Sequence, residues 1–226
     1  MMTYIKSIND NQQHILNDII ILYNNGNAFD CDPTFSKGVF YKNNIVPEPR
    51  LKFDLTPQTD DTVKASSDDL PLESSSINSI VFDPPFVISG KTWKESDEGS
   101  CKISKRFGVY YSFEELKTHY YNSLKEFYRI LSNNGIVVFK YQNTVSSGKN
   151  HFTDLFVKTS AIDIGFNLVD EFILLSKSKM TSFGGRWKTQ RHALKYHSYF
   201  LVLRKEKNKV DYKLDDYKES HDGNNY

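Results

Sequence analysis

Residues Leu70–Phe86 have the sequence LPLESSSINSIVFDPPF, and this stretch decides the fold. The six residues INSIVF (77–82) are mostly apolar and include branched side chains that favour a strand. Serines precede this run and two consecutive prolines follow it, so turns bound it on both sides. A short apolar strand of this kind is typical of the interior of a parallel sheet. Open α/β sheets carry their sites beyond the carboxyl ends of the strands, so Asp83–Phe86 is the first candidate site.

Further strands and helices alternate along the chain on both sides of this strand. The other predicted strands are Ala28–Cys31, Leu51–Asp54, Thr62–Ala65, Gly135–Tyr141, Leu168–Leu175 and His197–Arg204. Helical spacing covers Asn9–Asn25, a long segment from Phe113 to about Asn133, and His151–Ile164. Ser112 and Glu115 form a capping box before the long helix, and Gly26 and Gly165 follow the other two. We expect an α/β sandwich of about seven strands, mostly parallel, whose last strand is antiparallel.

The composition is typical of one globular domain. The chain has 226 residues, of which 38% are hydrophobic and 14% aromatic, which argues against disorder. No apolar run reaches the roughly 18 residues of a membrane span, and the amino terminus lacks the apolar core of a signal peptide. Cys31 and Cys101 are the only cysteines, so neither a disulfide framework nor a metal site is expected. We expect a soluble, cytoplasmic protein in a reducing compartment, with one domain over residues 1–207 and a polar, flexible tail over residues 208–226.

The tetrapeptide Asp83-Pro84-Pro85-Phe86 suits chemistry on an amino group. Two prolines fix the backbone and donate no N–H, so the segment presents carbonyl oxygens and one carboxylate as acceptors. The exocyclic nitrogen of adenine or cytosine is a poor nucleophile because its lone pair is delocalised into the ring. Hydrogen bonds from its two hydrogens to the Asp83 carboxylate and the Pro84 carbonyl would favour a tetrahedral nitrogen that attacks a methyl group. Phe86 would hold the base by stacking.

These residues resemble the motif [DNS]-P-P-[YFW] of the amino-methyltransferases. The resemblance implies a Rossmann-like class I methyltransferase fold, with helices on both faces of the sheet, and S-adenosylmethionine as cofactor. It also implies that Asp83, Pro84, Pro85 and Phe86 are the catalytic residues, and that the acceptor is an exocyclic amino group of a nucleic-acid base. The resemblance extends from about Ala28 to Arg204.

Three further segments resemble cofactor-binding parts of that family. Asp32-Pro33-Thr34-Phe35-Ser36-Lys37-Gly38 follows the first strand and resembles D-P-x-x-G-x-G, with Ser36 in place of a glycine. Asp54 ends the second strand, where the family's acid takes the two ribose hydroxyls. Ser66–Leu72 resembles D-x-x-x-L-P, with Ser66 at the acidic position and Asp68 or Asp69 as the substitute. The resemblance therefore implies these cofactor-binding residues: Asp32, Pro33, Thr34, Gly38, Asp54, Ser66, Asp68, Asp69 and Leu70.

The basic segments are the candidates for binding nucleic acid. From Ser176 to Lys209 the chain has ten Lys or Arg and one acid, Glu206. Phe183 and Trp187 interleave with these cations, a mixture that neutralises phosphates and stacks on bases. Two loops, about 87–111 and 176–197, would contact the substrate. Lys140 and Gln142, on one face at the end of their strand, would approach the base or its phosphate. The remaining candidates are Arg186, Trp187, Lys188, Arg191, His192, Lys195 and His197.

The sequence leaves the substrate open among several alternatives. Adenine in DNA is the leading hypothesis, with cytosine close behind. Adenine or guanine in transfer or ribosomal RNA is an alternative with the same chemistry, because no separate recognition domain is visible. A catalytically silent nucleic-acid-binding subunit is an alternative of another class, supported by the Ser36 and Ser66 departures. Because no separate recognition domain is visible, target recognition would depend on the loops at about 87–111 and 176–197, on a partner protein, or on a homo-oligomer.

Overall fold

The computed structural model describes residues 4–88, 110–176 and 191–207, together with Val210 and Tyr212. Its helices are α1 (Gln12–Tyr23), the 3-10 helix η1 (Val39–Asn44), α3 (Phe113–Ile130) and α4 (Thr153–Ile164). Its strands are β1 (Ile8–Asn9), β2 (Cys31–Asp32), β3 (Leu51–Asp54), β4 (Val63–Lys64), β5 (Ile77–Phe82), β6 (Leu131–Tyr141), β7 (Thr144–Ser146), β8 (Lys149–His151), β9 (Phe166–Leu175) and β10 (His197–Lys205).

One sheet carries the strands in the order β1-β9-β10-β6-β5-β2-β3-β4. Strands β2 to β6 pair in parallel, β10 runs antiparallel to both β6 and β9, and β1 is parallel to β9. The chain thus has a Rossmann-like α/β fold, and the predicted antiparallel last strand is confirmed. The sheet has eight strands rather than seven, because the two residues of β1 extend its edge beyond β9.

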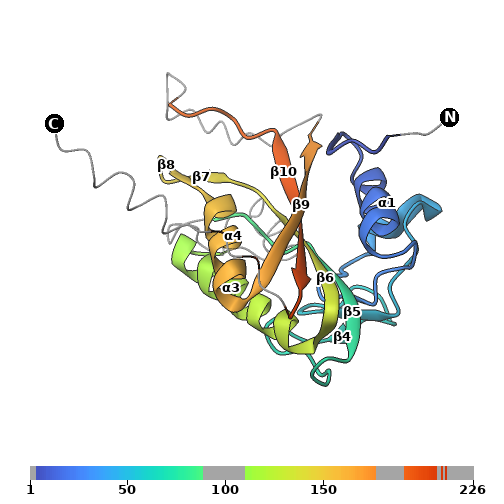
Figure 1. The fold of residues 1–226 in the computed structure, drawn as a ribbon. Coiled ribbons are helices and arrows are strands. Elements are labelled where there is room, and N and C mark those ends of the chain that lie inside the picture. The colour runs from blue at the N-terminus through green and yellow to red at the C-terminus, as the bar shows by residue number, and fades with distance from the viewer. Residues whose placement is uncertain (1–3, 89–109, 177–190, 208–209, 211, 213–226) are drawn as a thin grey trace.

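Helices cover both faces of the sheet, as predicted (Figure 1). Side chains alternate along β6, so Val137 and Phe139 face α3 and α4, whereas Ile136 and Val138 face α1. Both layers exclude water, and these four side chains are at most 1% exposed. The sheet is therefore rigid where its parallel strands end, which is the edge that carries the candidate site.

The local signals explain where the helices begin and end. The Asn11 side chain accepts from the N–H of Gln13 and caps α1. The capping box of α3 forms: Ser112 Oγ accepts from the N–H of Glu115, whose carboxylate accepts from the N–H of Tyr111. Gly165 closes α4 in a left-handed conformation with φ of 117°.

Several predicted boundaries are wrong for identifiable reasons. Strand β2 is Cys31–Asp32 rather than 28–31, because the N–H of Asp30 donates to the Ser79 hydroxyl instead of a strand partner. Helix α4 begins at Thr153, because His151 pairs with Thr144 in the hairpin of β7 and β8. Helix α3 ends at Ile130, and β6 follows it without a break.

Two residues of the predicted tail contact the sheet. The N–H of Val210 donates to Asn167 Oδ1 at 2.9 Å, and the N–H of Leu168 donates to the Tyr212 hydroxyl at 2.5 Å. The chain therefore remains in contact with β9 beyond residue 207, where the sequence places the end of the domain.

Candidate functional site

Asp83 lies directly beyond β5, between the carboxyl ends of β2 and β6. Its backbone N–H donates to Thr34 Oγ1 at 2.9 Å, and its carboxylate Oδ2 lies 3.0 Å from the Nζ of Lys140. The Asp83 side chain is 29% exposed, so part of the carboxylate still reaches solvent. The carboxylate is therefore held in one orientation as an accessible hydrogen-bond acceptor.

Lys140 lies behind this carboxylate, on the face of β6 that is directed toward α1. Its ammonium group also donates to Gln12 Oε1 at 3.3 Å, and it lies 5.1 and 5.5 Å from the ring centroids of Phe40 and Phe200. The residue is only 9% exposed, and a charge buried to that extent needs a partner. Its charge is thus paired within the protein, which differs from the contact with a base or a phosphate that the sequence suggests.

The remainder of the tetrapeptide is fixed by its prolines and by α3. Pro84 is buried, and the hydroxyl of Tyr120 donates to the carbonyl of Pro85 at 2.7 Å. Tyr120 is itself fully buried and packs edge-on against Phe82. Phe86 is half-buried. Its ring is thus placed on a backbone that has little freedom to move.

Asp32 organises the loop beside the tetrapeptide. It is 2% exposed; its Oδ1 accepts from the N–H and the hydroxyl of Thr34, and its Oδ2 accepts from the hydroxyl of Tyr41 at 2.7 Å. Burial raises the pKa of Asp32 to about 7, and the negative charge of Asp83 adds to the shift. Thr34 therefore links the two acids, because its hydroxyl contacts Asp32 and accepts from the N–H of Asp83.

The backbone from Ser36 to Gly38 turns back toward β3. Ser36 has φ of 50°, and its N–H donates to Asp54 Oδ2 at 2.9 Å, while Asp54 Oδ1 accepts from the N–H of Thr56. Gly38 has φ of 60°, and a Cβ atom there would lie 2.9 Å from the Phe35 ring. The loop thus adopts a left-handed conformation at Ser36, where the family motif has glycine.

The loop after β4 is a tight turn with acidic side chains. The N–H of Asp69 donates to the carbonyl of Ser66, whose hydroxyl donates to the carboxylate of Asp68. The N–H of Leu70 donates to Glu126 Oε1 at 2.9 Å, and this fixes the turn on α3. Asp69 is exposed and Asp68 is half-buried, so both carboxylates reach the surface.

A polar chain beneath this turn was not predicted from the sequence. His119 of α3 has Nε2 2.8 Å from the hydroxyl of Ser67 and Nδ1 2.6 Å from the hydroxyl of Tyr110. The Ser67 hydroxyl also lies 2.9 Å from that of Ser123. Burial lowers the pKa of His119. The only sequence signal was the position of His119 on the buried side of α3, which by itself indicates packing.

The nucleic-acid candidates lie partly at this same edge of the sheet. Gln142 donates its side-chain N–H to the carbonyls of His197 and Lys195, at 2.7 and 3.4 Å, and ties β6 to the segment before β10. His197 Nε2 lies 2.8 Å from the hydroxyl of Tyr199. Arg191 is exposed, and His192 contacts the turn between β7 and β8. Arg186, Trp187 and Lys188 lie outside the described residues, as does most of the loop predicted at 87–111.

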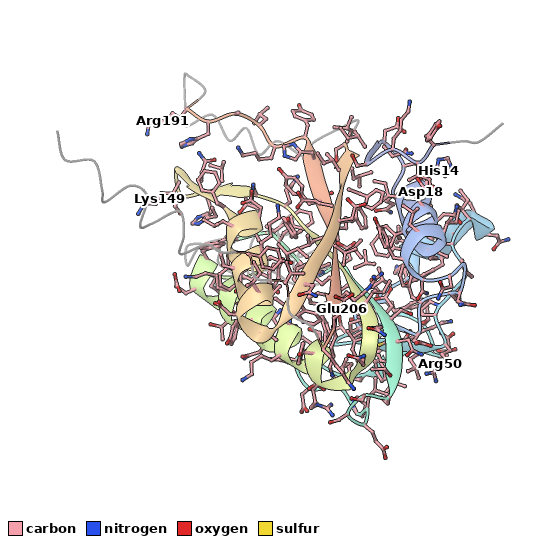
Figure 2. All side chains as sticks on the ribbon, in the orientation of Figure 1. His14, Asp18, Arg50, Lys149, Arg191 and Glu206 are labelled. Atoms are coloured by element: carbon pink, nitrogen blue, oxygen red, sulfur yellow. The ribbon has the colours of Figure 1, made fainter. Side chains whose placement is uncertain are left out.

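A hollow in the described part of the structure lies away from this chemistry. A cavity of about 550 Å³ opens where β2 and β5 begin, and it is lined by residues that include Asp30, Arg50 and Asn78. Figure 2 shows Arg50 near that end of the sheet. The tetrapeptide Asp83–Phe86 follows the other end of β5, so this cavity is not part of the candidate site. Among the described residues, no cluster of three metal-ligating side chains occurs, and no helix could span a membrane.

Comparison with known proteins yields structural matches only. No protein-family model and no curated protein matches the chain. TTHA0409 of Thermus thermophilus, described as a DNA modification methylase and crystallised with S-adenosyl-L-methionine, matches with a TM-score of 0.41 and 13% identity over 69% of this chain and 59% of that one. The cytosine-N4-specific PvuII DNA methyltransferase matches with a TM-score of 0.44 and 18% identity over 62% and 47%.

The matched proteins do not share one activity. The [4+2]-cyclase SpnF matches with a TM-score of 0.48 and 11% identity, over 85% of this chain and 80% of SpnF. The chain spans little more than half of TTHA0409 and less than half of the PvuII enzyme. A likeness at this level does not decide function, which rests on the residues of the site.

Proposed function

We propose that this chain transfers a methyl group from S-adenosylmethionine to the exocyclic amino group of a nucleic-acid base, with adenine in DNA as the leading substrate. The observation that carries the proposal is the Asp83 carboxylate. It lies at the carboxyl end of a central strand, it is oriented by Thr34 and Lys140, and two prolines follow it. This arrangement presents acceptors to a ligand that carries an N–H group.

The proposed mechanism uses the Asp83 carboxylate and the carbonyl of Pro84 as hydrogen-bond acceptors. The free lone pairs of the Asp83 carboxylate and the carbonyl of Pro84 accept the two hydrogens of the amino group, and Phe86 stacks on the base. The nitrogen lone pair then points away from these acceptors and toward the methyl donor. As the new N–C bond forms, the nitrogen gains positive charge, which the negative charge of Asp83 stabilises. The surplus proton leaves to Asp83 or to solvent.

The residues around Asp54 fit a ribose and an adenine. A carboxylate has about four lone-pair positions; Asp54 Oδ1 accepts from the N–H and, at 3.4 Å, from the hydroxyl of Thr56, and Oδ2 accepts only from the N–H of Ser36, so Oδ2 keeps a lone pair for a ribose hydroxyl and the long Thr56 hydroxyl bond would give way to a second. Asp68 or Asp69 would accept from the adenine amino group. The backbone near Gly38 would take the methionine carboxylate. When bound, S-adenosylmethionine supplies an electrophilic methyl group on its sulfonium sulfur.

Asp32 has a supporting role in this proposal. Both of its carboxylate oxygens are taken by Thr34 and Tyr41, and it is only 2% exposed, so it holds the cofactor loop in shape rather than contacting a ligand. The target base must leave its helix or come from a single strand, because the Asp83 side chain is only 29% exposed and cannot reach an amino group that is stacked inside a duplex.

The test is transfer of label from labelled S-adenosylmethionine to duplex DNA, single-stranded DNA and RNA, followed by nucleoside mass spectrometry. N6-methyladenine in DNA is the expected product. Label in cytosine or in RNA would move the proposal to those alternatives. Absence of label from every polymer, with the cofactor bound, would overturn the proposal and favour a silent binding subunit.

A matched variant separates chemistry from binding. Asp83→Asn keeps the size and one acceptor oxygen of the side chain but removes the charge. We expect transfer to fall by about 100-fold or more, since a charge opposite the reacting nitrogen is lost. Cofactor affinity should stay within about a factor of two, because Asp83 makes no contact with Asp54. Equal loss of both would mean that Asp83 holds the cofactor or the fold.

A further inference from the structure

The hairpin formed by β7 and β8 belongs to the rim of the candidate site. It begins three residues after the end of β6, and the Ser146 hydroxyl donates to the carbonyl of Ile88, just beyond the tetrapeptide, at 3.4 Å. Ile88 in turn forms a parallel bridge with Tyr110. The hairpin is thus in contact with the chain that leaves the tetrapeptide.

A second segment, residues 191–196, lies along this hairpin. His192 Nε2 donates to the carbonyl of Gly148 at 2.8 Å, and the Asn150 side-chain amide lies 3.1 Å from His192 Nδ1. Figure 1 shows the chain that leads into β10 passing over β7 and β8, and Figure 2 shows Lys149 and Arg191 at that same end of the molecule. We call residues 144–152 and 191–196 the hairpin platform.

The platform combines cations with exposed rings. Lys149 and Arg191 are exposed. Phe152 and Tyr196 are 59% and 43% exposed, whereas most of the other aromatic residues that the structure describes are buried. The nearest acid along the hairpin and α4 is Asp154, which is only half-exposed. Cations neutralise phosphates and flat rings stack on unpaired bases, so this mixture matches a single nucleic-acid strand better than an apolar protein partner.

Polar groups at the root of the hairpin have unused hydrogen-bonding capacity. Among the described residues, five buried side-chain N or O atoms have no hydrogen-bond partner, and four of them belong to Thr144, Asn150, Thr153 and Asp154. An unpaired buried polar group costs free energy. One side-chain hydrogen bond, from the N–H of Asp154 to Asn143 Oδ1 at 3.0 Å, joins the root of the hairpin to α4, and these four atoms add none to it.

We propose that the hairpin platform binds the sugar-phosphate backbone and an unstacked base of a single nucleic-acid strand, next to the base that enters at Asp83. Lys149 and Arg191 contact phosphates, and Phe152 or Tyr196 stacks on a neighbouring base. The inference rests on the proposed function, because the platform would bind the strand while its target base reaches Asp83. Lys149 is exposed and Phe152 is 59% exposed, so substitution of either by alanine removes little packing.

The test measures binding of a fluorescein-labelled single-stranded DNA of 12 mixed nucleotides by anisotropy, over a range of salt concentrations. For the double variant Lys149→Ala, Arg191→Ala we expect the Kd to rise about tenfold at 0.1 M salt. The slope of log K against log salt should fall by about 1.4, at roughly 0.7 for each phosphate contact. Phe152→Ala should raise the Kd about fivefold without a change in slope.

Matched controls come from the outer face of α3. Lys125 and Tyr121 are a cation and a partly exposed ring 6.0 Å apart, and their substitution by alanine should change neither Kd nor slope. Equal effects of the control and platform variants would overturn the inference, as would a wild-type chain that does not bind the strand.

Cofactor binding and transfer separate this inference from the proposed function. If the wild-type chain transfers no methyl group while the platform variants still weaken strand binding, the proposed function fails and the platform stands. If the wild-type chain methylates DNA and the platform variants bind and methylate like wild type, the platform fails and the proposed function stands. If the platform variants weakened binding of a protein partner but left binding of the DNA strand unchanged, the inference would also be overturned.

Discussion

Substitution of Lys140 by methionine should separate the orientation of Asp83 from the stability of the fold. Methionine keeps an unbranched stem between Phe40 and Phe200 but removes the ammonium group that lies 3.0 Å from the Asp83 carboxylate. Without that cation the carboxylate loses the ion pair that orients it, while the bond from the Asp83 backbone N–H to Thr34 remains. We expect slower methyl transfer with little change in cofactor affinity.

The structure sets the magnitude of this effect. Two unit charges 3.0 Å apart attract by about 5 kcal/mol at an effective dielectric constant near 20. The cost of removing both charges from water offsets much of this attraction. Because Asp83 is 29% exposed, the net free energy of the ion pair lies between that of a surface pair and that of a fully buried pair. About 2 kcal/mol is a reasonable central value. If all of it acts in the transition state, the rate falls about 30-fold.

The assay is single-turnover methyl transfer, with cofactor affinity from calorimetry and the free energy of unfolding from urea titration. Lys158→Met is the control, because Lys158 lies 3.0 Å from Glu171, whose side chain is 28% exposed against 29% for Asp83. It should lose stability but keep the transfer rate. Lys140→Arg should recover part of the rate. A wild-type rate for Lys140→Met, or an equal rate loss in the Lys158 control, would refute the reasoning.

Three further predictions concern the loop and the buried titrating groups. Ser36→Gly should raise the free energy of unfolding in urea titrations by about 0.5 kcal/mol, because glycine adopts φ of 50° without strain. Gly38→Ala should lower it by about 1 to 2 kcal/mol, because the added Cβ would lie too close to the Phe35 ring. The pKa of Asp32 is about 7 in the folded chain, which is higher than in the unfolded chain. The stability that Asp32 contributes should therefore decline as pH rises from about 4 to about 7. This pH dependence of the free energy of unfolding should be absent in Asp32→Asn. The pKa of His119 is lowered in the folded chain, so the pH dependence runs the other way: the stability that His119 contributes is lost as pH falls below about 6.5. His119→Gln should remove this pH dependence of the free energy of unfolding. An unchanged pH dependence in either variant would contradict the assignment of the group that it removes.

The sequence predicts the sheet well where apolar runs are long. The bounds of Leu51–Asp54 and Ile77–Phe82 match β3 and β5 without correction, because turn residues limit both runs. The hairpin at Thr144–His151 was missed because its strands are three residues long and polar, so they have no apolar alternation to reveal them. Strand β1 has two residues and is defined only by its pairing with β9.

The sequence predicts that Asp83 and Lys140 lie near each other, but not the contacts that they make. The motif predicts Asp83 and the approach of Lys140, since adjacent strands end together. It does not predict that the cation faces Asp83, because this depends on which face of β6 residue 140 occupies and on the rings of Phe40 and Phe200. The chain from Ser67 through His119 to Tyr110 joins three segments that are distant in the sequence. No spacing rule within one segment would find it.

The two acids joined by Thr34 have different environments, and this difference assigns their roles. Burial together with the charge of Asp83 raises the pKa of Asp32 to about 7. Asp83 has Lys140 at 3.0 Å and partial access to solvent. Burial therefore favours the neutral form of Asp32, which suits a residue that shapes the loop, whereas the Asp83 carboxylate has a cation beside it and an oxygen surface open to a ligand. A carboxylate placed in this way is the acceptor that the proposed reaction on an amino group requires.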